Sequence, residues 1–290
     1  MSLLRDRMSR DMERAGLALR TRKEYIAAIR HMAEFFRRSP DVLSPDDIRA
    51  WADEMDRRGR GPDWKAVHVA ALLFLYRRTL ARPEMVSFLA FPRRPRRFPV
   101  ILSPAETGRL LASLREPRYR VFYTLLYDTG LRISEAAQLQ AEDIDRCRGV
   151  LQVRHGKGGK ERQVKLGDRL YELLRAYWRE VRQKGPGAER LTRESLVFVS
   201  GTGGPLNFAS ARKALAIATR EANIAKRVTP HSLRHAYATA QLEAGMDLRA
   251  LQVQMGHSSL RSTQIYLHVS NHLIRQSPSP LDSLPPLPPP

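Results

Sequence analysis

Residues 229–266 read TPHSLRHAYATAQLEAGMDLRALQVQMGHSSLRSTQIY, and this stretch decides how the whole chain is interpreted. It holds a His-x-x-Arg cluster at His231 and Arg234, a Gly-His pair that ends at His257, and a tyrosine, Tyr266, nine positions later. Arginine and histidine bind phosphate oxygens through charged hydrogen bonds, and a tyrosine hydroxyl can serve as a nucleophile. The pattern predicts a tyrosine that attacks a phosphodiester inside an anion-binding site, which indicates DNA chemistry.

Two segments further upstream extend the pattern. Arg132 follows Thr-Gly-Leu at an expected break between helices, and Glu135 lies three residues later on the same helix face, where its carboxylate can hold the guanidinium. Residues 150–154 and 162–166 alternate in polarity as strands do, and the turn that joins them carries Lys157. The sequence therefore predicts a β-hairpin with a lysine at its tip.

In-line displacement at phosphorus gives each of these side chains a candidate role. Arg132 and Arg234 can each donate two parallel hydrogen bonds to the non-bridging oxygens, and His257 is a further donor to them. A phenol has a reference pKa of about 10, so attack needs a base, for which His231 is the candidate. Lys157 is the candidate acid for the leaving 5′-oxygen. A covalent phosphotyrosine keeps the bond energy, so we expect no metal and no nucleotide cofactor.

Each of these residues also has a purely structural explanation. A single arginine is usually a surface ion-pair partner, and Tyr266 between two aliphatic residues would usually be a core aromatic. His231 and His235 stand four apart, as zinc ligands on a helix do. No glutamate follows His231, and the chain has a single cysteine, Cys147, so we expect no metal site.

The charge of the chain agrees with a nucleic-acid partner. Lysine and arginine number 50 against 30 aspartate and glutamate, which leaves a formal charge of +20 on 290 residues. A polyanion is the expected partner, although charge alone does not separate DNA from RNA or an anionic membrane. The start of the chain lacks the apolar stretch of a signal peptide, no transmembrane run is seen, and a single cysteine fits a reducing cytoplasm.

Apolar positions at helical spacing predict a small helical domain over residues 1–91. One of its helices is expected to start at Ser44, which can cap, with Pro45 in the first helical position. Another is expected at about residues 64–80, with His68 turned outward. The domain should therefore present basic helix faces.

Residues 92–100 hold three prolines, which prevent a regular helix, and four crowded arginines. We expect an extended interdomain linker that lies on DNA phosphates. The arginines concerned are Arg93, Arg94, Arg96 and Arg97. A linker that is basic only for solubility is the alternative.

A capping box at Ser103 and Glu106 opens a second domain, expected over residues 101–276. Residues 277–290 are rich in serine, proline and leucine, so we expect a disordered or polyproline-like tail there. Besides the hairpin, the elements expected in the second domain are a helical pair over 120–138 broken at Gly130, helices over about 168–183 and 208–222, and a short strand over 196–199.

At these positions the sequence resembles the tyrosine recombinase family, that is, the phage-integrase and Xer-type enzymes. Residues 129–135 resemble the family's first-arginine box, 156–162 its lysine box on a β-hairpin, and 229–235 its His-x-x-Arg box. Residues 255–269 resemble the closing box with the nucleophile. Four boxes in order with suitable gaps are very specific, and the likeness covers nearly the whole chain.

The resemblance implies an all-α N-terminal core-binding domain of the SAM-like type and a mixed α/β, mainly helical catalytic domain with a small β-hairpin sheet. It implies that Tyr266 forms a 3′-phosphotyrosine with DNA, and that Lys157 is the general acid and His231 the candidate base. Arg132, Arg234 and His257 are then the phosphate ligands. Lys160, a second lysine in the turn, matches the acid position less well and is expected to contact DNA.

The resemblance also implies partners. They are double-stranded recombination sites, and four protomers that synapse two duplexes and exchange strands through a Holliday junction. Only residues 268–276 precede the terminal prolines, which leaves the geometry of a cyclic assembly open. We expect a tetramer on DNA and a monomer off it, in the bacterial cytoplasm and on the nucleoid when active, with accessory proteins left open and no membrane partner.

Three other functions compete with mobile-element integration and excision, which the proline-rich tail and high arginine content favour slightly. The first is Xer-like resolution of chromosome or plasmid dimers. The second is a catalytically idle DNA-binding regulator, which would be expected to lack Tyr266 or an arginine, and none is lost. The third is a type IB topoisomerase, against which the separate N-terminal helical domain argues.

Overall fold

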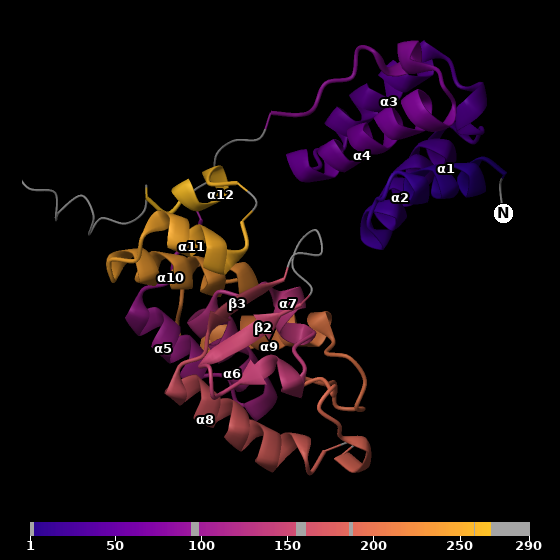
Figure 1. Cartoon of the computed structure of the whole chain (residues 1–290). Helices are drawn as coiled ribbons and strands as arrows, with labels where there is room; N and C mark the ends of the chain where they lie inside the picture. The colour runs from indigo at the N-terminus through magenta and orange to yellow at the C-terminus, as the bar shows by residue number, and fades with distance from the viewer. Residues whose placement is uncertain (1–2, 94–98, 155–160, 186–187, 258, 268–290) are drawn as a thin grey trace, which may run out of the picture. The chain divides into compact units, whose positions relative to one another are not determined.

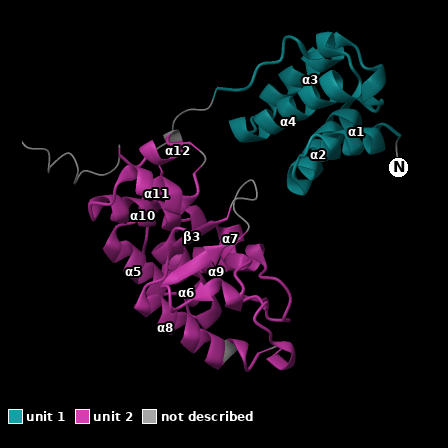
Figure 2. Ribbon diagram, in the orientation of Figure 1, with its two compact units in different colours: residues 1–97 teal, residues 98–290 magenta. Residues whose placement is uncertain are grey.

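The structure is a computed structural model that describes residues 3–93, 99–154, 161–185, 188–257 and 259–267. The predictions for Arg94, Arg96, Arg97, for the two lysines Lys157 and Lys160, and for the tail lie outside these residues. The chain divides into two compact units, residues 1–97 and 98–290, which Figure 2 distinguishes by colour.

The N-terminal unit is helical over its described residues, and α4 lies against α2 in it. Its helices are α1 (Leu3–Arg14), α2 (Leu19–Phe36), α3 (Pro45–Arg57) and α4 (Pro62–Phe74), which continues as a wider π-helical turn (Leu75–Thr79), with short 3-10 turns at Pro40–Val42 and Pro83–Val86. Trp51 and three methionines, Met8, Met12 and Met32, are buried in its core. This confirms the predicted helical N-terminal domain.

Both helix starts that the sequence predicts are confirmed. The Ser44 hydroxyl accepts a hydrogen bond from the Asp47 backbone N–H at 3.2 Å, and the Asp47 carboxylate accepts the Ser44 N–H at 2.9 Å. Ser103 and Glu106 exchange the same two bonds at 3.1 and 2.7 Å. Each reciprocal pair satisfies backbone donors that a helix end would leave unpaired.

In the C-terminal unit, α6 contacts α5, α7, α8, α9 and α10, and its Phe122, Leu125 and Leu126 are fully buried. Figure 1 shows these helices. Helix α10 lies across α6, and α11 contacts both α10 and β3. The helices of this unit are α5 (Pro104–Ala112), α6 (Pro117–Thr129), α7 (Ile133–Ala137), α8 (Asp168–Tyr177, extended by a π-helical turn, Trp178–Arg182), α9 (Phe208–Glu221), α10 (Pro230–Glu243), α11 (Leu248–Met255) and α12 (Arg261–Gln264), with 3-10 turns at Ala141–Asp143 and Ala188–Arg190.

A small antiparallel sheet of order β1-β2-β3 completes this unit. Its strands are β1 (Ile144–Asp145), β2 (Val150–Val153) and β3 (Arg162–Lys165), and Val153 pairs with Arg162 at the end of the hairpin next to the segment that connects the two strands. The two predicted hairpin strands are confirmed to within one residue at their ends. The fold class, helical N-terminal domain plus mainly helical domain with a small sheet, is also confirmed.

The predicted strand over residues 196–199 is wrong. Leu196 and Val199 each make only an isolated bridge, to Gln140 and Pro205. Val197 and Phe198 between them are fully buried. The apolar run therefore reflects burial in the core, and among the described residues no neighbouring strand continues the pairing.

The prediction that His68 points outward is also wrong, because its exposed fraction is 3%. Its Nδ1 lies 3.0 Å from the Trp64 carbonyl oxygen, and its Nε2 lies 3.3 Å from His31 Nδ1. Helix α4 is apolar around most of its circumference, so the period of a one-sided helix does not describe it.

Candidate active site

The turn between α6 and α7 places Arg132. Gly130 ends α6 with a left-handed φ of +63°, and a Cβ there would lie 2.3 Å from Tyr237 Cδ1, so glycine is required. Arg132 then caps α7, and its backbone N–H donates to Glu135 Oε2 at 2.8 Å. The sequence predicts this support by Glu135, and the geometry agrees with it.

Glu135 holds two guanidinium groups at once. Arg132 Nη1 donates to Glu135 Oε1 at 2.7 Å, and Arg162 donates from Nη1 and Nη2 to both carboxylate oxygens at 3.0 and 2.8 Å. The Glu135 side chain is 1% exposed. Burial raises its pKa, but the hydrogen bonds from Arg162 and from the Arg132 backbone outweigh this and hold the pKa below its ordinary value. The buried carboxylate is therefore ionised.

Arg234 is buried on α10, with an exposed fraction of 4%. Its Nη1 and Nη2 donate to the carbonyl oxygens of Gly130 and Met255, each at 2.5 Å. Burial and the nearby charge of Arg132 lower its pKa to about 10, so it stays protonated at neutral pH. Arg132 is fixed in the same manner, because its Nη2 donates to the Gly256 carbonyl oxygen at 2.9 Å.

Gly256 and His257 follow the end of α11. Gly256 has a left-handed φ of +59°, and a Cβ there would lie 3.0 Å from Arg162 Nη1. His257 Nδ1 is 2.9 Å from the hydroxyl of Thr263, which is fully buried. Burial, together with Arg234 and Arg132, lowers the His257 pKa to about 4, so the ring is neutral at neutral pH.

Tyr266 is 2% exposed, and its hydroxyl is 2.9 Å from His235 Nδ1. Burial raises its pKa to about 12, although the charges of Arg234 and Arg132 act in the opposite direction. The expected nucleophile is thus also a core aromatic in the free protein, and it is neutral. The core-aromatic explanation weighed from the sequence is confirmed, and the nucleophile role stays a prediction.

The sequence did not reveal the contact between His235 and Tyr266. It presented His235 only as a possible metal ligand. His235 lies one helical turn after His231 on α10, and burial lowers its pKa to about 4. His231 lies at the exposed first turn of the same helix, where partial burial and the charges of Arg234 and Arg132 lower its pKa. The spacing of four residues was the signal that both rings share a helix face.

Arg162 is the second missed residue. The sequence presented it as an ordinary strand position, yet its side chain is only 9% exposed and reaches Glu135. It begins β3, directly after the undescribed segment 155–160 that carries Lys157 and Lys160. Of the linker arginines, Arg93 is described and is exposed.

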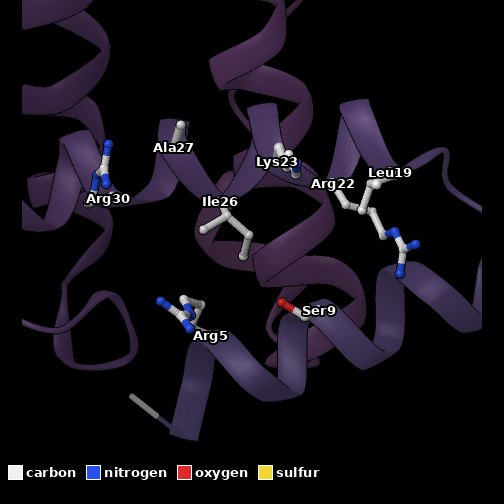
Figure 3. A pocket seen from close by; sticks show the side chains of 8 residues that line it. All are labelled: Arg5, Ser9, Leu19, Arg22, Lys23, Ile26, Ala27 and Arg30. Atoms are coloured by element: carbon white, nitrogen blue, oxygen red, sulfur yellow. The ribbon is translucent and has the colours of Figure 1, made fainter. Parts of the chain in front are cut away.

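A basic groove lies between α1 and α2 in the N-terminal unit (Figure 3). Its volume is about 450 Å³, and Ile26 points from α2 toward α1 across it. The lining residues are Arg5, Ser9, Leu19, Arg22, Lys23, Ile26, Ala27 and Arg30. Four cationic side chains beside a small apolar floor are suited to a phosphate backbone.

The described residues contain neither a metal-binding cluster nor a membrane-spanning helix. No group of three or more histidine, cysteine, aspartate or glutamate side chains among them could hold a metal ion. Within the same residues, no helix has both the length and the apolar character that crossing a membrane requires.

Comparison with known sequences identifies both parts of the chain. Residues 101–272 match the phage integrase family, and residues 4–84 match the phage integrase N-terminal SAM-like domain. A putative integrase/recombinase of Sinorhizobium fredii, y4qK, is 37% identical over 295 residues, which cover all of this chain and 93% of the relative. The tyrosine recombinase XerD of Staphylococcus saprophyticus is 37% identical over 211 residues, 70% of this chain and 69% of the relative.

Solved structures share the fold. The XerH site-specific recombinase bound to palindromic difH substrate, a post-cleavage complex, matches 92% of this chain and 82% of its own with a TM-score of 0.72 at 21% identity. The XerA recombinase matches 94% of this chain and 95% of its own with a TM-score of 0.54 at 27% identity. With both domains matched and relatives similar over most of their length, the chain belongs to the phage integrase family of tyrosine recombinases.

Proposed function

We propose that this protein is a site-specific DNA recombinase that cleaves and rejoins strands through a 3′-phosphotyrosine at Tyr266. The observation that carries the proposal is the arginine cluster, in which Arg132 and Arg162 bind the carboxylate of Glu135 and the charge of buried Arg234 lies close enough to interact with it. An excess of positive charge is fixed there before any ligand arrives. Preorganised donors of this kind stabilise the charge that develops on a phosphoryl group.

Arg132 and Arg234 bind the non-bridging oxygens of the scissile phosphate in this mechanism. Backbone carbonyls hold both side chains, so binding a phosphate requires little loss of conformational entropy. His257, whose Nδ1 is occupied by Thr263, is a further donor through its other ring nitrogen. We expect the protein to bind the phosphate through these three side chains.

The chemical step transfers one phosphoryl group and two separate protons. The Tyr266 oxygen attacks phosphorus, the bond to the 5′-oxygen breaks, and the leaving oxygen takes a proton from Lys157. The phenolic proton passes to a base, and His231 is the residue proposed for this role. His235 is a second possible acceptor, because its Nδ1 already contacts the Tyr266 hydroxyl. Attack by the 5′-hydroxyl of another strand reverses the step and rejoins the DNA, so no external energy source enters the balance.

Duplex DNA is the proposed partner of both units. Fold relatives include a lambda integrase dimer bound to a COC′ core site and the Tn1549 transposon integrase in complex with circular intermediate DNA. We propose that the groove with Lys23 and Arg30 and the exposed Arg93 contact the phosphate backbone. The catalytic assembly is a homotetramer on two synapsed sites, with strands exchanged through a Holliday junction, and the free protein is a monomer.

Integration and excision of a mobile element is the proposed biological role, in the cytoplasm and on the nucleoid when active. The arginine-rich, proline-tailed composition and the integrase/recombinase relatives support it. Resolution of chromosome or plasmid dimers is the second candidate, favoured by the similarity to XerD over 70% of this chain.

The experiment that tests the function is covalent trapping on nicked duplex fragments from genomic DNA and element ends, followed by denaturing recovery and sequencing of protein-linked DNA. The wild type and Tyr266→Phe are run side by side. Adducts from the wild type alone, at one partly palindromic sequence, are the expected result and also reveal the site. DNA binding by both proteins without any adduct would support the idle regulator instead.

A further inference from the structure

The two arginines that share Glu135 are not equivalent. The Arg132 side chain is 21% exposed, whereas that of Arg162 is 9% exposed. Arg162 makes both parallel hydrogen bonds to the carboxylate, and Arg132 uses only one of its terminal nitrogens there, Nη1. Glu135 is therefore paired mainly by the residue that lies deeper.

Arg162 is also fixed on its remaining sides. Its Nε donates to the Gln254 carbonyl oxygen at 2.7 Å, and its guanidinium covers the Cα of Gly256, where no side chain fits without displacing it. All three nitrogen atoms of the guanidinium thus have partners on α7 and at the end of α11. Three of its five N–H donors are used within the protein, and its side chain is less exposed than that of Arg132.

We propose that Arg162 is a positioning residue that neutralises Glu135 and thereby leaves Arg132 available to the scissile phosphate. The inference rests on the proposed function of the site. A buried carboxylate with one arginine draws that arginine into a bidentate pair, because this geometry satisfies both oxygens. If Arg162 were absent, Arg132 would be that arginine, and its donors would turn from the phosphate to Glu135.

A double-mutant cycle tests this on the full-length protein, with Arg162→Met, Glu135→Gln and the double variant. The rate of covalent adduct formation is measured at saturating DNA, on the recombination site that the trapping experiment identifies. Arg162→Met is expected to slow cleavage by about 10- to 100-fold. This is less than the roughly 100- to 1000-fold lost when a preorganised donor itself is removed, because Arg162 acts through Arg132. The double variant should be faster than Arg162→Met alone, because the carboxylate that captures Arg132 is gone. Equal or slower cleavage by the double variant would overturn the inference.

A neutral substrate separates positioning from a general loss of folding. A methylphosphonate at the scissile position carries no negative charge on its non-bridging oxygen, so it needs Arg132 less. The rate ratio of wild type to Arg162→Met should therefore fall toward one on this substrate, as it should for the matched control Arg132→Met. A ratio that stays the same on both substrates means that Arg162 acts only on stability, and the inference fails.

The outcomes also distinguish this inference from the proposed function. If the wild type forms no Tyr266-dependent adduct on any site, the proposed function fails, and the positioning role fails with it. If the wild type forms adducts and Arg162→Met forms them equally fast, only the positioning role is overturned. Arg162→Lys, which keeps the charge but not the fork, should lie between wild type and Arg162→Met.

Discussion

The proposed active site has two parts, the arginine cluster and the surroundings of Tyr266, which differ in how far they are formed before DNA binds. In the arginine half, Arg132 and Arg234 are charged and are held by backbone carbonyls and by Glu135. In the nucleophile half, Tyr266 is 2% exposed, its hydroxyl contacts His235, and its pKa is raised to about 12 by burial. The proposed phosphate site is therefore formed in the free protein, whereas the proposed nucleophile is buried there.

This difference has a physical advantage for a strand-transferase. A preformed cluster of cations increases the affinity for the DNA backbone without any rearrangement. A buried, neutral phenol does not attack the wrong phosphodiester before the correct site is bound. The comparison therefore predicts that changes in the nucleophile half abolish chemistry and spare binding, and that changes in the arginine half weaken chemistry in proportion to the lost charge.

The largest expected effect comes from Tyr266→Phe. Removal of the hydroxyl should eliminate the covalent adduct completely, because no other group in the proposed mechanism forms the bond. The dissociation constant for site DNA should change little, since the hydroxyl contacts His235 in the free protein. Gel-shift titration beside the trapping assay measures both quantities, and residual adduct in this variant would show that Tyr266 is not the nucleophile.

Arg234→Gln probes the arginine half. Loss of one preorganised charged donor should lower the single-turnover cleavage rate by about 100- to 1000-fold. Arg162→Gln at saturating DNA is the comparison. Its guanidinium is held by Glu135 and the Gln254 carbonyl and is proposed to act through Arg132, so its loss should have the smaller effect. Equal losses in both variants would contradict the distinction between phosphate-binding and positioning arginines.

His235→Ala is expected to remove the contact that the Tyr266 hydroxyl makes in the free protein. Opening the space beside the phenol exposes it to water, so the pKa of Tyr266 should fall from about 12 toward the ordinary value near 10. Ultraviolet titration of this variant, minus the same variant with Tyr266→Phe, isolates the one phenol. His231→Ala is the matched control and should leave the Tyr266 pKa where it is.

The two units should also respond differently to acid. Burial lowers the pKa values of His235 and His257 to about 4 in the catalytic unit, and lowers that of His68 in the N-terminal unit. A histidine with a depressed pKa is neutral when folded, so the unfolded chain binds more protons below about pH 6.5. Stability is therefore full above that pH and falls as the pH decreases toward 4, by on the order of a few kcal/mol for the catalytic unit.

Tryptophan fluorescence of the full-length protein can follow each unit by itself. Trp178→Phe leaves Trp51 and Trp64 as reporters of the N-terminal unit, and Trp51→Phe with Trp64→Phe leaves Trp178 in the catalytic unit. Urea unfolding between pH 7.5 and 4.5 should show the larger decrease with the Trp178 reporter. Parallel decreases would mean that the histidines beside Tyr266 do not dominate the acid response.

The smallest effect is expected at the groove of the N-terminal unit, where phosphate binding is separate from chemistry. Lys23→Ala should weaken DNA binding modestly and reduce the slope of log affinity against log salt by about 1. The cleavage rate at saturating DNA should not change. Arg20→Ala, also on α2 but not lining the groove, is the control. An unchanged salt slope in Lys23→Ala would remove the groove from the DNA interface.

Features with a local cause could be predicted from the sequence. The caps at Ser44 and Ser103 depend on residues three positions apart, and the hairpin strands show their own alternation. The support of Arg132 by Glu135 also lies within one helical turn. In each case the residues that determine the structure are neighbours in the sequence.

The contacts that the sequence did not reveal join distant segments. Arg162 and Glu135 are 27 residues apart, and His235 and Tyr266 are 31 apart. Nothing in the strand alternation around Arg162 distinguishes a buried guanidinium from an exposed one. The burial of Tyr266 likewise depends on the core cluster that it shares with Leu251 and Met255 of α11, which local patterns do not specify.

The most direct measurement of the central claim is the environment of Tyr266 with and without DNA. A single 3-fluorotyrosine at position 266 gives one fluorine resonance, recorded for the free protein and for its complex with an uncleavable site duplex. We predict a solvent-shielded signal with a high phenol pKa in the free protein, and a different, more exposed signal on the duplex. A signal that indicates an exposed ring already in the free protein, or that stays the same when DNA binds, would contradict the claim that Tyr266 is buried until DNA binds.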